Sequence, residues 1–217
     1  MATLTKSIGL VLVSLVLVSS KYAQGPYVLT IHEIGLCPRE EIGETGDDLQ
    51  LDGRIHHQRG AKSPAFSGNA TLLNNPVTVG NSMITTYVAK WDTVSGWRKN
   101  FAILRFGEAC QGLKTYLKTY YKEFIESHAP GFPLECPIKE GTYRVNNVSL
   151  RYDGPALFPV MPYGRFRLDG VMHYMNTASK KIRGCGRFVV ETTERLGQEK
   201  LSSLNIGQES LLTKIRQ

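Results

Sequence analysis

The 217-residue sequence lacks the motifs of several common enzyme classes. It contains no GxSxG, HExxH or P-loop pattern, which argues against hydrolases with a nucleophile elbow, zinc proteases and nucleotide hydrolases. The adjacent His56 and His57 would point to opposite sides of a strand, so they are poorly placed to share a metal ion. We therefore expect a protein that is not an enzyme and that has no cofactor and no metal site.

Beyond its N-terminus the sequence also lacks an apolar run of the roughly 20 residues that a membrane-spanning helix needs. At the N-terminus, Lys6 is followed by the mostly apolar run IGLVLVSLVLV and then by small residues. This layout is typical of a secretory signal peptide. We assign residues 1–20 to it; cleavage after Ala23 and an uncleaved N-terminal anchor are the alternatives. The mature chain is then expected outside the cell or, alternatively, in a lysosomal lumen.

Basic runs, zinc-finger spacings and RNA-binding aromatic motifs are missing as well, although the formal net charge is +7. We therefore expect no nucleic-acid partner. The positive charge is spread along the chain. It fits either weak attraction to anionic lipid headgroups or solubility alone.

Cysteine is scarce, with four residues and no CxxC pair. An even number in an exported chain favours two disulfides over a metal site. Three pairings are possible, and we favour Cys110–Cys136, which flank a helix-like segment, and Cys37–Cys185, which lie near the first and last predicted strands. Two sequons, at Asn69 and Asn147, predict N-glycosylation at surface positions.

What the chain does contain is mostly short strand-like runs separated by Gly, Pro, Asn and Asp. Six clear runs cover residues 27–34, 81–91, 100–106, 141–152, 164–175 and 185–193, and two weaker ones cover 49–57 and 68–74. This pattern predicts an all-β sandwich of two sheets in one domain. We place the domain at residues 26–194 and a polar tail at 195–217.

Three local patterns refine this prediction. Residues 112–127 have apolar side chains at helical spacing, which predicts an amphipathic helix that either covers the sandwich or faces a membrane or ligand. In residues 142–150 the alternation changes phase, which predicts a β-bulge at Asn146–Asn147. The clearest alternation, in residues 164–174, predicts a dry face with Phe166, Leu168, Met172 and Tyr174 and a wet face with Arg165, Arg167, Asp169 and His173.

The segment ALFPVMPYG, residues 156–164, is apolar, but Pro159 and Pro162 keep it out of a helix or a central strand. It belongs to the longer stretch ECPIKEGTYRVNNVSLRYDGPALFPVMPYGRFRLDGVMHY, residues 135–174. This stretch resembles the signature half of an arthropod branch of the ML lipid-recognition superfamily. That branch is related to the ganglioside activator protein and includes insect chemosensory secreted proteins. The similarity extends over about residues 108–190.

The resemblance implies a secreted, disulfide-bonded, immunoglobulin-like β-sandwich whose two sheets part to hold a lipid. It also implies a first-to-last disulfide and a helix-flanking disulfide, which agrees with the pairs favoured above. The ganglioside activator protein has eight cysteines where this chain has four. For that reason its rim geometry and its glycolipid substrate are not carried over.

On this basis Phe158, Val160 and Met161 are expected to form a rim loop at the opening of a lipid cavity; the alternative is that the loop caps the core. The expected ligand-binding walls are Trp91, Phe101, Ile103, Phe166, Leu168, Met172 and Tyr174, although inward residues of any sandwich follow the same pattern.

The expected function is a secreted protein that binds a lipid or other hydrophobic small molecule, such as a pheromone or cuticular lipid. Alternatives are an accessory protein that presents membrane glycolipid to a hydrolase and a ligand-free extracellular interaction domain. Further expected partners are a membrane surface, contacted transiently, and a receptor or hydrolase.

Overall fold

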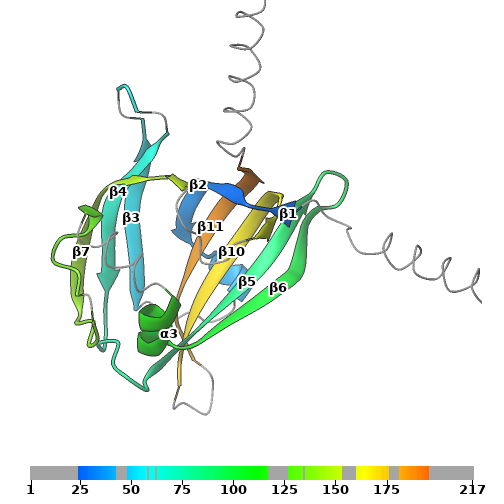
Figure 1. The fold of residues 1–217 in the computed structure, drawn as a ribbon. Helices are drawn as coiled ribbons and strands as arrows, with labels where there is room; N and C mark the ends of the chain where they lie inside the picture. The colour runs from blue at the N-terminus through cyan, green and yellow to red at the C-terminus, as the bar shows by residue number, and fades with distance from the viewer. Residues whose placement is uncertain are drawn as a thin grey trace, which may run out of the picture.

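The computed structural model describes residues 24–42, 48–57, 59–61, 63–116, 127–133, 135–152, 160–175 and 181–195. Most of these residues form antiparallel strands (Figure 1). The predicted signal peptide, Phe158 and nearly all of the predicted tail lie outside the described residues.

Two sheets form the body of the fold. The larger sheet has the strand order β6-β5-β10-β11-β2-β8, and the smaller has the order β3-β4-β7. The strands of the larger sheet are β2 (Tyr27–Leu36), β5 (Ser82–Asp92), β6 (Gly96–Glu108), β8 (Arg151–Tyr152), β10 (Gly164–Tyr174) and β11 (Ile182–Glu194). The smaller sheet contains β3 (Leu49–His56), β4 (Ala65–Leu72) and β7 (Gly141–Ser149). A separate short pair joins β1 (Gln24–Gly25) to β9 (Met161–Pro162).

The sequence patterns that predicted strands correspond to strands in every case, and the all-β sandwich is confirmed. The bulge at Asn146–Asn147 is also confirmed. Val148 pairs with Phe66 and Val145 with Gly68, so two residues of β7 stand opposite Ser67. Asn147 takes a positive φ of 51° there, and its side chain is exposed, as is that of Asn69.

The two sheets face each other. Ile84 of β5 and Met172 of β10 pack in one apolar cluster with Leu72 of β4 and Tyr143 of β7. We call the face of the larger sheet that carries Met172 the inner face and its opposite the outer face. The chain passes between the sheets at Leu150, which is fully buried; its amide donates to the carbonyl of Pro64, and its carbonyl accepts from the amide of Ile31.

Two helices and two disulfides complete the described fold. The helix α3 (Ala109–Tyr116) lies at one end of the sandwich beside both sheets (Figure 1), and the short helix α2 (Arg39–Ile42) follows β2. Residues 117–126 of the predicted amphipathic helix lie outside the described residues. The disulfides are Cys37–Cys185 and Cys110–Cys136, the two pairs that the sequence analysis favoured. No described helix is long and apolar enough to span a membrane.

Candidate functional site

The inner face of the larger sheet is apolar across five strands. Val88, Phe166 and Val190 form its buried centre. Around them lie side chains that are only half-buried, from β2, β6, β10 and β11: Leu29, Ile31, Phe101, Ala102, Leu104, Leu168 and Phe188. Leu168 and Phe188 are cross-strand partners on the two middle strands, so their exposure is not an effect of a sheet edge.

The smaller sheet presents a second apolar face toward this one. By register, Leu51 of β3, Ala70 of β4 and Tyr143 of β7 share the face of Leu72. All three are half-buried, and Ile55, further along the same face, is 37% exposed. Inward side chains of a solid sandwich interdigitate and become buried. The described residues therefore leave apolar surface partly uncovered on both facing sheets.

At the end next to α3 the space between the sheets is closed. Leu72, Val77, Ala109 and Ile138 are buried together there, and the Cys110–Cys136 disulfide packs against them. A second close approach occurs at Gly184 of β11, where an added Cβ would lie 2.5 Å from the Cβ of Leu49. Only glycine lets β3 approach the larger sheet this closely.

The structure brings together some of the predicted wall residues. Phe101, Phe166 and Leu168 lie in the inner-face cluster, with the Phe101 and Phe166 rings 5.6 Å apart, and Met172 packs at the closed end. In the predicted rim loop, Val160 is exposed and Met161 is held in β9, while Phe158 lies outside the described residues.

Trp91 and Ile103 are not brought to the inner face. Ile103 stands opposite Tyr87, which pairs with Asp169 on the outer face, and Trp91 follows Tyr87 in the alternation of β5. In a regular strand Phe101 and Ile103 would share a face. They do not, because β6 is irregular just before them: Lys90 pairs with Arg98 and Val88 with Ala102, and Asn100 has a positive φ of 57°.

Tyr174 belongs to a polar network instead of an apolar wall. Its hydroxyl donates to Asp48, which also pairs with the fully buried Arg183 at 3.2 Å. Arg183 further donates to Ser82 at 2.7 Å and to the carbonyl of Asn75. Burial, together with the hydrogen bond to Asp48, raises the pKa of Tyr174 above its ordinary value. This network fixes the start of β3 to β5, β10 and β11 at the closed end.

The predicted wet face of β10 is largely covered, which corrects the expectation of a solvated surface there. Arg167 and Asp169 are only 9% and 8% exposed. Arg187, directly opposite Asp169 on β11, donates to it at 2.7 and 3.0 Å and to Glu41 of α2 at 3.1 and 3.0 Å. Arg167 lies 3.2 Å from Glu41 and stacks over the Trp97 ring at 5.6 Å.

The charges in this network stabilise one another's ionised forms. The hydrogen bond from Arg187 lowers the pKa of Glu41, burial opposes this effect, and the positive charges of Arg187, Arg167 and Lys99 add to it. Burial alone would lower the pKa of Arg187, but its hydrogen bonds to Asp169 and Glu41 outweigh burial and raise it. Both groups are therefore ionised at neutral pH.

No sequence pattern indicated that Glu41, Asp48, Arg183 and Arg187 belong to polar networks. The alternation of residues 164–174 only placed Arg167 and Asp169 together on a wet face. The available signal was the opposite charge of residues on β10 and β11, but matching them requires the strand register. No three of the described His, Cys, Asp and Glu residues are grouped so that they could hold a metal ion.

Comparison of the chain with protein-family models and with curated proteins found no match.

Proposed function

We propose that this chain is a secreted carrier that holds a lipid or another hydrophobic small molecule between its two β-sheets. The observation that carries the proposal is the half-buried state of Leu168 and Phe188 in the middle of the larger sheet, opposite a second apolar face. Apolar side chains that neighbouring protein does not cover are a favourable surface for an apolar ligand.

Burial of an apolar chain supplies the driving force for such a ligand. Each buried methylene contributes about 0.8 kcal/mol, so a chain of about ten supplies roughly 8 kcal/mol before the cost of ordering is subtracted. The described fold requires no catalytic group for this role. Within the proposed class, a pheromone or a cuticular lipid would be a suitable ligand.

Two further features support the proposal. Two disulfides indicate an oxidising environment, extracellular or lumenal, in which a carrier of this kind would act. The sandwich and its disulfide pairs also agree with what the resemblance to the ML superfamily implies, and we propose membership of that superfamily on this ground.

Native mass spectrometry of the protein secreted from insect cells tests the function. The expected result is a mass increment that corresponds to a fatty acid, hydrocarbon or phospholipid, together with saturable uptake of the fluorescent fatty acid cis-parinaric acid. A protein that carries no ligand and takes up no probe would contradict the carrier and favour the interaction domain. Stimulation of a glycosidase on membrane glycolipid, without retention of free lipid, would favour the accessory role.

A further inference from the structure

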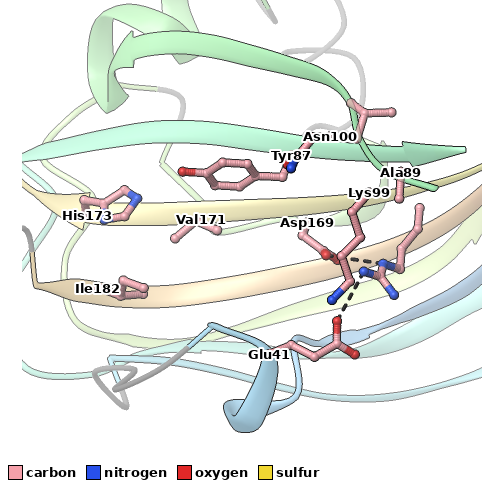
Figure 2. A pocket seen from close by; sticks show the side chains of 11 residues that line it. Glu41, Tyr87, Ala89, Lys99, Asn100, Asp169, Val171, His173 and Ile182 are labelled. Carbon is pink, nitrogen blue, oxygen red and sulfur yellow. Dashed lines mark ion pairs between the residues drawn. The ribbon is translucent and has the colours of Figure 1, made fainter. Parts of the chain in front are cut away.

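A cavity lies on the outer face of the larger sheet, away from the proposed lipid site. It has a volume of about 300 Å³. Its two ends differ (Figure 2): Lys99, Asp169 and Glu41 lie at one end, Val171, Ile182 and His173 lie at the other, and Tyr87 lies between them. A cavity with one charged and one mostly apolar end suits a small amphipathic ligand.

The charged end has an excess of positive charge. Arg187 uses its guanidinium on Asp169 and Glu41, and among the described residues these are the carboxylates that line the cavity. Arg167 is more than nine-tenths buried and lies 3.2 Å from Glu41; its Nε lies 3.3 Å from Asp169 but forms no hydrogen bond among the described residues. Three cations, Lys99 included, therefore share two anions.

Lys99 is the cation that has no direct carboxylate partner among the described residues, and its charge acts on Glu41 only at longer range. It forms no ion pair or hydrogen bond within the described part of the chain, yet its side chain extends across the cavity toward Glu41 (Figure 2). The irregular segment of β6 places it there. Lys99, Asn100 and Phe101 together stand opposite Ala89, and the positive φ of Asn100 turns the chain so that Lys99 and Asn100 line the cavity.

We propose that this cavity binds a small organic carboxylate. Its charged group would be held by Lys99 and Arg167, and its apolar body would lie on Val171, Ile182 and Tyr87. An anion would balance the surplus positive charge and offer Arg167 a charged acceptor, whereas a neutral ligand of the same shape would leave the charge unbalanced and offer at most an uncharged acceptor. The site is independent of the lipid site because the two occupy opposite faces of the larger sheet.

Methyl and amide NMR titration of the intact secreted protein with 3-phenylpropionate and with hexanoate tests the proposal. The expected result is saturable binding of at least one of them with a Kd below about 1 mM. The perturbed signals should be those of Val171, Ile182 and Lys99. The neutral analogue 3-phenylpropan-1-ol should bind at least about fivefold more weakly, because it offers no charge-assisted contact.

Two variants distinguish the effect of a positive charge inside the cavity from the effect of a positive charge elsewhere on β6. Lys99→Gln should weaken binding about three- to tenfold, whereas Arg98→Gln, which removes the same charge from the neighbouring residue outside the cavity, should leave it unchanged. Equal losses in the two variants, equal binding of the alcohol or no saturable binding would overturn the proposal. Perturbations confined to inner-face residues such as Leu168 and Phe188 would overturn it too, while supporting the lipid site.

Discussion

At the scale of single residues, the most consequential side chain is Arg183. It is fully buried; its charge is balanced by Asp48 at 3.2 Å, and it donates to Ser82 at the start of β5 and to carbonyls of the preceding turn. Removing one partner of a buried ion pair leaves the other charge uncompensated in a medium that solvates it poorly. Stability at the closed end of the sandwich therefore depends on both members of the pair being present.

Arg183→Met is expected to lower the free energy of unfolding by about 3–5 kcal/mol. Urea unfolding followed by fluorescence measures this loss. Arg165→Met is the matched control, because Arg165 lies 3.2 Å from Glu33 on the exposed surface and should cost less than about 1 kcal/mol. The double variant Asp48→Asn with Arg183→Met should lose less than the sum of the two single variants. Equal losses for Arg183→Met and Arg165→Met would count against a buried pair.

Glu41 makes a pH-dependent contribution whose sign follows from its lowered pKa. Its ordinary value is 4.5, and its folded-state value is lower because of the hydrogen bond from Arg187. The contribution is therefore fully present above about pH 4.5 and is lost as the pH falls through the folded-state pKa. Glu41→Gln should be destabilising at pH 7, and its difference from the unaltered protein should shrink below pH 4.5. Unfolding curves at both pH values test this, with Glu33→Gln as the control for loss of one surface charge.

At the scale of elements, local patterns were sufficient to predict the strands. The alternation in residues 164–174 and the change of phase at Asn146–Asn147 are both properties of neighbouring residues, so a single sequence contains them. The faces of β6 could not be predicted in the same way. The irregularity opposite Ala89 has no clear signature in the sequence, and it decides that Phe101 points inward and Ile103 outward.

The buried networks were missed for a different reason. Asp169 and Arg187 are 18 residues apart, and Asp48 and Arg183 are 135 apart. Whether these residues form ion pairs depends on strand register and on the packing of one sheet against the other. Neither can be read from the position of a polar residue in an alternating strand. The sequence therefore predicted which residues lie on the polar face of β10. It did not predict that Glu41 of α2 lies against that face.

The hairpin of β5 and β6 is the described element best placed for the transient membrane contact that the sequence analysis expected. Val94 is 94% exposed at its tip, and Asp92 fixes the turn by accepting hydrogen bonds from the amides of Val94 and Ser95 at 3.0 and 2.9 Å. Trp91 and Trp97 pack edge to face behind the tip, and the exposed Arg98 and Lys99 follow. Tryptophan and basic residues around an apolar tip suit the interface of an anionic bilayer.

Val94→Asp should weaken binding to phosphatidylserine-containing vesicles by at least about threefold, because a carboxylate at the tip resists insertion and is repelled by the lipid charge. Co-sedimentation with vesicles measures the effect. Val79→Asp is the matched control: Val79 is also an exposed valine in a turn, 79% exposed, but it precedes β5 at the other end of the strand. If both variants bind vesicles equally, the hairpin is not the contact.

At the scale of the whole molecule, the question is whether the two sheets enclose space or packed side chains. A dense interior and a hollow one respond differently to added volume. In a packed core, extra atoms force side chains off their rotamers at a cost of about 1–3 kcal/mol, whereas a hollow accommodates them. Added volume can therefore be used to test the proposed lipid site without knowledge of the ligand.

Ala70 is suitable for this test because it is half-buried on the inward side of β4, between Leu51 and Tyr143. Ala70→Phe should change the free energy of unfolding by less than about 1 kcal/mol while reducing uptake of cis-parinaric acid several-fold, since the ring occupies space that the ligand needs. Ala109→Phe, at a position only 1% exposed, is the control for a packed site and should lose about 1–3 kcal/mol. If Ala70→Phe were as destabilising as Ala109→Phe, the sheets would be packed against each other and the carrier would have no room for its ligand.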